Sequence, residues 1–380
     1  MTSASRAQPN AAASPGAAPS AHAAKLPHPA QPAHPARAAA RPHPHHGALA
    51  LVGLALLLAA ALLFSLACGS HGCSAGDLWQ AAFGQAQDDA QALASELIWR
   101  LRLPRAFTAL AVGGLLALAG ALLQVLLRNP LADPYVLGVS SGASLAAVAA
   151  LWLGAGSWAL TGAAWGGALV STLALFALGR RSLATLDLRS AGPASARLLL
   201  TGVMLAAAWT ALISLALTLA PDAQLRGMLF WLIGEITGSE PWAPALAALI
   251  VLLVLALAQA RSLNVLLLGD ARAMSLGVAV PRLRIYVCAL AAAATAFAVT
   301  TAGALGFVGL LVPHVMRRLV GNDQRLLLPA CVLAGGAVVV LADLLARSVV
   351  APTQLPVGAV MSLVGVPVFL WVLHHAGEQA

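Results

Sequence analysis

Long runs of apolar residues follow one another from residue 48 onwards, separated by short polar stretches. A helix that crosses a bilayer needs about 20 mainly apolar residues, and about ten segments approach this length. These segments are 48–67, 105–127, 134–153, 158–178, 198–219, 244–258, 285–301, 303–320, 326–345 and 357–373. Most of them lack the polar face that a helix of a soluble bundle shows. The pattern therefore predicts an all-α, polytopic membrane protein with about ten transmembrane helices.

Composition supports a membrane as the natural solvent of this chain. The chain is 60% hydrophobic and 9% charged, and its mean hydropathy is +0.87. A soluble domain carries about 25% charged residues, so a soluble globular protein is excluded. The net charge of +8 would suit nucleic acid, but the basic residues cluster in a few loops, as in membrane proteins. We therefore expect membrane lipid around the chain and no nucleic-acid partner.

The first 46 residues differ from the rest. They are rich in Ala, Pro and His and hold six of the ten histidines, with almost no large apolar side chains. Such a segment cannot bury enough surface to fold, so we expect a disordered cytoplasmic tail over 1–46 and a transmembrane domain over 47–377. The stretch before the first apolar run is too long for a signal peptide. The alternative is a metal-sensing role for the tail, because His-rich tracts bind metal.

Loop charges predict the orientation in the membrane. The tail carries Lys25, Arg37 and Arg41 and no acid, whereas the loop 69–97 carries four acids and no Lys or Arg. The positive-inside rule places the tail in the cytoplasm and this loop outside. Ten spans then place both termini in the cytoplasm. A basic cluster at 100–105 breaks the rule on the outer side, so it needs a partner unless its side chains reach the lipid headgroups.

The sequence shows no catalytic constellation. A phosphate-binding loop needs Gly-Lys-Ser/Thr, but Lys25 in the tail is the only lysine, so we predict that the chain is not an enzyme and does not hydrolyse ATP itself. Asp343 is the one deep acid that could serve a stand-alone secondary transporter or channel, which is the alternative class. The four cysteines show no metal-ligand spacing. Cys68 and Cys73 could pair, although we favour isolated apolar cysteines.

Two segments interrupt the helical pattern. The first, 128–143, contains Pro130, Pro134, Gly138 and Gly142, and the second, 303–314, contains three glycines and a proline. Interrupted segments in both halves of a transporter indicate a translocation path. Close packing of helices at glycines explains the same pattern equally well, so the residues alone leave both interpretations open.

Three blocks of residues carry a family resemblance. They are Arg102-Leu-Pro-Arg105 with Gly120, Gln124, Asn129-Pro-Leu-Ala132 and Leu137-Gly-Val-Ser140; Gly306-Phe-Val-Gly-Leu310 with Pro313-His314, Arg317, Gly321 and Leu328-Pro329; and Ala342-Asp343 with Arg347, Leu355-Pro-Val-Gly358 and Gly365-Val-Pro-Val-Phe369. Together they resemble the iron-chelate, haem and cobalamin permease family of type II ABC importers, over about residues 48–375. The tail is outside the family pattern.

The resemblance implies a permease fold and a set of partners. The family forms homodimers of ten-helix subunits in the bacterial inner membrane. Two ATP-binding-cassette subunits, which hold ATP and Mg, bind on the inside, and a periplasmic substrate-binding protein binds on the outside. We therefore expect this chain to bind no cofactor and to pass a metal chelate from periplasm to cytoplasm. Among haem, cobalamin and iron-siderophores, the first two are slightly favoured.

The resemblance also assigns residue roles. It implies that Asn129, Leu131 and Ser195 form the translocation gate, and that Arg102, Arg105 and Arg347 dock the binding protein. For Arg347, pairing with Asp343 one turn earlier is the alternative. The loop that couples to the ATPase subunits comprises Leu267, Leu268, Gly269, Asp270, Ala273, Leu276 and Gly277. His314 could ligate haem or a metal, but we favour a packing role.

Overall fold

The computed structural model describes residues 44–69, 72–84, 89–184, 193–236, 242–351 and 353–377. These residues belong to one compact unit that begins at Pro42. Most of the predicted tail therefore lies outside the described residues. The first helix begins at Pro44, slightly before the predicted domain boundary at residue 47.

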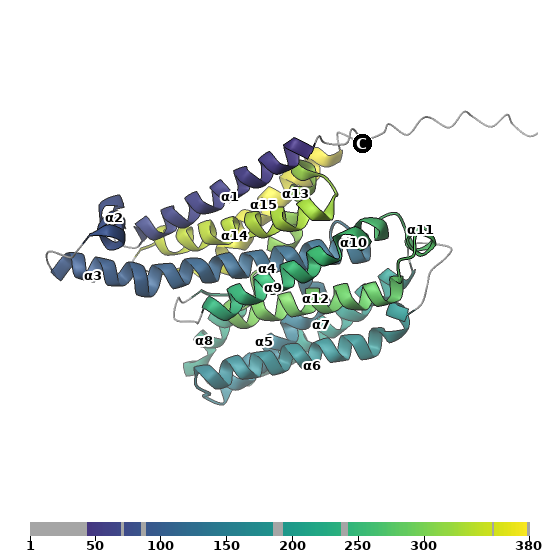
Figure 1. Ribbon diagram of the computed structural model, residues 1–380. Coiled ribbons are helices and arrows are strands. Elements are labelled where there is room, and N and C mark those ends of the chain that lie inside the picture. The colour runs from purple at the N-terminus through teal and green to yellow at the C-terminus, as the bar shows by residue number, and fades with distance from the viewer. Residues whose placement is uncertain are drawn as a thin grey trace, which may run out of the picture. The chain divides into compact units, whose positions relative to one another are not determined.

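The described part of the chain is helical apart from one small hairpin, which confirms the predicted all-α class (Figure 1). The long helices are α1 (Pro44–Ala67), α4 (Leu103–Leu127), α6 (Ser157–Ala184), α7 (Pro193–Leu219), α12 (Val280–Ala302), α14 (Gln324–Ser348) and α15 (Val357–Gly377). The shorter ones are α2 (Ala75–Phe83), α3 (Asp89–Leu97), η1 (Ile98–Arg102), η2 (Pro134–Leu137), α5 (Val139–Trp152), α8 (Asp222–Ile233), α9 (Trp242–Ala258), α10 (Ala260–Leu266), α11 (Asp270–Ser275) and α13 (Val308–Val320).

Each of the ten predicted spans coincides with a helix of the structure: α1, α4, α5, α6, α7, α9, α12, α13, α14 and α15. Within the described residues, six helices are long and apolar enough to cross a membrane on their own, or seven if the bent pair α9–α10 is one span. Helices α5 and α13 are shorter than the predicted spans because α5 begins only after Gly138 and α13 only after Phe307, and both residues have positive φ. The chain is a multi-pass membrane protein.

Helix α4 forms the centre of the bundle. It begins with Pro104, whose fixed φ suits a first helical turn, and its apolar run is buried throughout. It packs against α14 on one side and α12 on the other (Figure 1). A Cβ on Gly113 would lie 2.2 Å from the carbonyl oxygen of Gly335 on α14, so glycine at this position is what allows the two backbones to approach.

Three helices leave large apolar faces uncovered. The apolar windows of α1, α6 and α7 are mostly exposed, and Leu63, Leu173 and Leu212 are among their exposed side chains. Apolar surface of this extent on a membrane protein contacts lipid or another subunit.

A short hairpin follows α1. Strands β1 (Cys68–Gly69) and β2 (Gly72–Cys73) pair antiparallel, with Cys68 opposite Cys73. Cys68 is disulfide-bonded, whereas Cys288 and Cys331 are free and buried. The preference for isolated cysteines was therefore wrong for Cys68. The register of the hairpin, which the sequence pattern did not reveal, brings the backbone of Cys73 opposite Cys68, as the alternative pairing requires.

Candidate functional site

The first interrupted segment joins α4 to α5. Helix α4 ends at Arg128, which adopts the left-handed conformation with φ of 48°, a strained geometry for a residue other than glycine. The side-chain oxygen of Asn129 then accepts a hydrogen bond from the Leu131 amide at 2.9 Å. A carboxylate oxygen of Asp133 accepts one from the Tyr135 amide at 2.8 Å. These side-chain-to-backbone bonds hold a defined turn where the two prolines prevent a helix.

The electrostatics of this turn are set by burial. Desolvation raises the pKa of Asp133 from 3.8 to about 6, and the hydrogen bond from the Tyr135 amide opposes that change. The predicted gate residues Asn129 and Leu131 lie in the same turn, where Leu131 is 47% exposed and Asn129 is half-buried.

The second interrupted segment lies between α12 and α13 and meets the first. The Leu305 amide donates a hydrogen bond to the Tyr135 hydroxyl oxygen at 2.6 Å. A Cβ on Gly309 would lie 2.5 Å from Cδ of Pro134. Gln124 on α4 donates to the Leu310 carbonyl at 3.2 Å. The structure therefore brings together the two segments that the sequence singled out separately.

The end of α12 also lines a cavity that the sequence did not indicate. Its volume is about 250 Å³, and α5, α6 and α8 complete its wall. The carboxylate-bearing residue of the lining is Glu235, two residues after the end of α8, and Thr300 and Thr301 also line the cavity. Helix α8 was not among the predicted spans because its apolar run is too short. The sequence therefore gave no reason to single out Glu235 as a candidate functional residue.

The predicted coupling loop, 267–277, begins directly after α10 and contains α11 with the turns on either side of it. Leu268, Leu276 and Gly277 are exposed, whereas Asp270 and Ala273 are buried. Gly269 has φ of 106°, a conformation that favours glycine, and so allows the chain to turn sharply into α11. Figure 1 shows α10 and α11 at the opposite end of the bundle from α2 and α3. The exposed Leu268 and Leu276 flank the short helix α11, where they can pack against a partner protein.

Asp270 does not face outwards with the leucines. Its two carboxylate oxygens accept hydrogen bonds from Arg128, at the end of α4, and from Arg284, in the first turns of α12. The Asp270 side chain is 2% exposed and the Arg284 side chain 7%. The predicted loop residue is therefore buried between two helix ends. We name Arg128, Asp270 and Arg284 the loop cluster.

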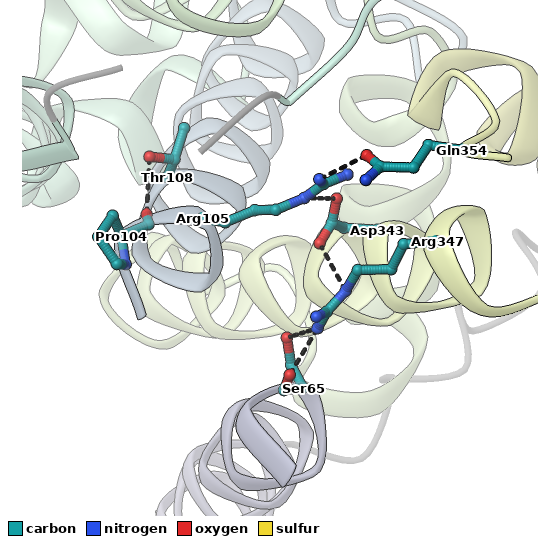
Figure 2. Close-up of polar contacts among 7 residues, drawn as sticks. All are labelled: Ser65, Pro104, Arg105, Thr108, Asp343, Arg347 and Gln354. Carbon is teal, nitrogen blue, oxygen red and sulfur yellow. Dashed lines mark hydrogen bonds and ion pairs between the residues drawn. The ribbon is translucent and has the colours of Figure 1, made fainter. Parts of the chain in front are cut away.

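Two of the three predicted docking arginines, Arg105 and Arg347, are also buried, and Figure 2 shows both of them beside Asp343. Arg105 Nε lies 2.8 Å from Asp343 Oδ1, and Arg105 Nη1 donates to Gln354 Oε1 at 2.8 Å. Arg347 Nε lies 3.5 Å from the other oxygen of Asp343, and Arg347 Nη2 donates to the hydroxyl of Ser65 at 2.6 Å. We name Arg105, Asp343 and Arg347 the terminal cluster.

The terminal cluster gives these arginines a partner inside the chain. The pairing of Arg347 with Asp343, which was the alternative for this residue, is present. Arg102 donates to the carbonyl oxygen of Leu66 at 2.8 Å, at the end of α1. Arg100 is different, because its side chain is 79% exposed and pairs with Glu96 one turn away. Arg100 is therefore more accessible to another protein than the half-buried Arg102 or the buried Arg105 and Arg347.

The remaining predicted residues are placed as follows. Ser195 lies in the first turn of α7, but its side chain is outside the described part, so its gate role stays a prediction. His314 lies on α13 and is half-buried. Among the described residues, no three His, Cys, Asp or Glu side chains gather as a metal site. The tail histidines fall outside the described ranges, except that the backbone of His45 and His46 belongs to the first turn of α1.

Comparisons with known proteins match this architecture. The model of the FecCD transport family matches residues 57–375. The vitamin B12 import system permease protein BtuC of Shigella sonnei is 38% identical over 333 residues, which cover 86% of this chain and 95% of that protein. The protein of the same name from Escherichia coli (strain K12 / DH10B) is equally similar, at 38% over 333 residues.

A solved structure agrees in fold. The chain superimposes on a metal-chelate type ABC transporter in an inward-facing conformation with a TM-score of 0.74 and 30% identity, covering 86% of this chain and 98% of that one. The helices, their order and the two interrupted segments therefore belong to a known architecture. This chain is a member of the FecCD transport family.

Proposed function

We propose that the chain is the membrane-spanning permease subunit of an ATP-driven importer and that its substrate is a metal chelate, cobalamin in the first place. The observation that carries this proposal is the 38% identity, over 95% of their length, to proteins named as vitamin B12 import permeases. The metal-chelate transporter that shares the fold supports the broader class. Haem and iron-siderophores remain the competing substrates.

The geometry supports transport through movement of whole helices. The two interrupted segments meet through Tyr135 and Leu305, so a change in one segment can be passed to the other. In this proposal, a separate ATPase subunit supplies the energy. The exposed Leu268 and Leu276 offer an apolar surface at one end of the bundle for an ATPase subunit. The chain itself has no phosphate-binding loop.

The family resemblance suggests the partners, and the exposed surfaces offer a place for each of them. Two ATPase subunits would bind the α10–α11 end, on the cytoplasmic side with both termini. A substrate-binding protein would dock at the α2–α3 end, with the exposed Arg100 as its first electrostatic contact. Part of the uncovered apolar surface of α6 and α7 would face a second copy of the chain, and the rest would face lipid of the inner membrane.

A stand-alone transporter is the second candidate, and Asp343 was its main support. A relay carboxylate has to be free to take up and release an ion. Asp343 instead lies between two arginines, and it cannot bind a cation without giving up those pairs. The terminal cluster therefore favours the importer subunit over a secondary transporter.

Reconstitution tests the proposal. The chain is placed in liposomes with its ATPase subunit, and its binding protein is added with cyanocobalamin, haem or a ferric siderophore in turn. We expect ATP-dependent uptake of cyanocobalamin and no uptake when the ATPase carries a disabled phosphate-binding lysine. Uptake of haem or siderophore alone would correct the substrate. Accumulation against a gradient by the chain without its ATPase would overturn the importer assignment.

A further inference from the structure

Asp270 occupies an unusual position for a residue of an exposed loop. It is the first residue of the six-residue helix α11, yet its side chain is almost fully buried. Both of its oxygens are used, one by Arg128 and one by Arg284. A carboxylate with two charge-assisted partners resists displacement more than one with a single partner, because both bonds must break together.

The two partners belong to the helices that lead into the interrupted segments. Arg128 ends α4 and is followed at once by Asn129 and the turn that contains Leu131. Arg284 lies on α12, which ends at Gly303, where the second interrupted segment begins. The Asp270 carboxylate is thus bonded to α4 at the end that enters the first interrupted segment. It is also bonded to the start of α12, whose other end enters the second interrupted segment.

The charges favour a mechanical role over simple loop stability. One aspartate faces two arginines, and Arg128 is 18% exposed while Asp270 is 2% exposed. Arg128 also holds a strained left-handed backbone at φ of 48°. Strain at the junction of a helix and a functional turn persists only when neighbouring contacts impose it. The ion pair with Asp270 is such a contact.

We infer that Asp270 is the joint that passes movement of the α10–α11 loop to α4 and α12, so that it positions the gate turn without itself contacting the ATPase. This inference rests on the proposed function. When a partner displaces α11, the carboxylate moves both guanidinium groups with it. The exposed Leu268 and Leu276 receive the partner, and the buried Asp270 transmits the displacement.

The test compares the loop cluster with a matched arginine. Asp270→Asn, Arg128→Gln and Arg284→Gln remove members of the cluster. Arg282→Gln is the control, because Arg282 lies on the same turn of α12 as Arg284 but is exposed. All are assayed as assembled complexes in liposomes with cyanocobalamin, and ATP hydrolysed per cobalamin imported is the readout. Co-purification of the ATPase subunit reports assembly.

We expect the cluster variants to bind the ATPase and to hydrolyse ATP within about two-fold of the unaltered complex, while ATP used per cobalamin rises about ten-fold. Asp270→Asn combined with Arg128→Gln should add little to either change alone, as for residues of one network. Asp270→Glu should restore most of the ratio, and Arg282→Gln should leave it unchanged.

Several results would overturn the inference. An unchanged ratio in Asp270→Asn refutes the joint, additive losses refute the shared network, and loss of ATPase binding makes Asp270 a docking contact instead. Should Asp270→Asn fail to accumulate, Arg128→Gln carries the test, because its side chain is partly exposed and tolerates change better.

A second readout separates this inference from the proposed substrate. A spin label on Leu131→Cys reports movement of the gate turn when a non-hydrolysable ATP analogue is added, without any substrate. We expect a change in label mobility in the unaltered background and none with Asp270→Asn. Absence of cobalamin uptake with a normal label response would refute the substrate alone. The same label response in both backgrounds would refute the joint.

Discussion

The terminal cluster and the loop cluster have the same composition, one aspartate between two arginines, and lie at opposite ends of helix α4. Arg105 is in the first turn of α4, and Arg128 caps its last turn. The terminal cluster joins α4 to α14, which pack along their length. The loop cluster joins α4 to a six-residue helix that packs mainly against α10.

This difference in surroundings gives the two clusters different consequences. Around Asp343, α4 and α14 are held together by apolar packing along their length. The ion pairs there neutralise buried charges between helices whose positions are already determined by that packing. Around Asp270, α11 has only six residues and adds Ala273 to the buried core, so apolar packing contributes less here and the two ion pairs contribute relatively more. The same three charges therefore serve stability at one end and transmission at the other. Substitutions that neutralise each aspartate can separate these two roles.

The largest expected effect is that of Asp343→Asn. It leaves Arg105 and Arg347 buried without a counter-charge, and removing one partner of a buried ion pair costs about 3–5 kcal/mol. We expect the thermal midpoint of the purified protein in detergent to fall by several degrees. Asp323→Asn is the control, because Asp323 is exposed at the other end of α14 and Asn caps a helix equally well. An unchanged midpoint would mean that water reaches the terminal cluster.

Asp270→Asn should destabilise the protein less, by about 1–3 kcal/mol, because Arg128 is 18% exposed and can turn to solvent. The midpoint measured in the same detergent should fall by about half as much as for Asp343→Asn. Equal losses would show that α11 is as much a part of the rigid frame as α14, and the mechanical distinction between the clusters would fail.

The sequence predicted the helices and the interrupted segments better than the ion pairs that join one helix to another. Runs of apolar residues located all ten helices because the length of a span is a local property. Gly and Pro marked both interrupted segments because their backbone restrictions are local as well. The pairing of Arg347 with Asp343 was also within reach, since the two lie one turn apart on a helix.

The ion pairs between helices could not be read in the same way. Arg105 and Asp343 are separated by 238 residues, and Arg128 and Asp270 by 142. Which of many arginines meets which acid depends on helix packing, which periodicity does not determine. Asp343 consequently looked like a relay acid, and Arg105 like a surface contact. Glu235 was missed because its helix is too short to stand out.

Exchange of Arg100 and of Arg105 for Glu should sharpen the contrast between exposed and buried charge. We expect Arg100→Glu to slow association of the substrate-binding protein several-fold at low salt, with the difference shrinking at high salt, because exposed charges mainly steer association. Arg105→Glu should lower the thermal midpoint instead. Association kinetics with the permease in nanodiscs measure the first effect. A folded Arg105→Glu protein that fails to bind would restore the predicted docking role of Arg105.

The smallest expected effect concerns the hydrogen bond from Arg347 of the terminal cluster to Ser65 on α1. Ser65→Ala removes the hydroxyl that accepts from Arg347 at 2.6 Å, but the Ser65 carbonyl still accepts from the same nitrogen. The loss should therefore be about 1 kcal/mol, visible as a small drop in the thermal midpoint. Ser214→Ala is the matched control, because the hydroxyl of this exposed serine donates to the Thr210 carbonyl one turn earlier on its own helix. If Ser65→Ala and Ser214→Ala change the thermal midpoint equally, the bond from Arg347 to Ser65 does not stabilise the packing of α1. The terminal cluster would then stabilise only the contact between α4 and α14.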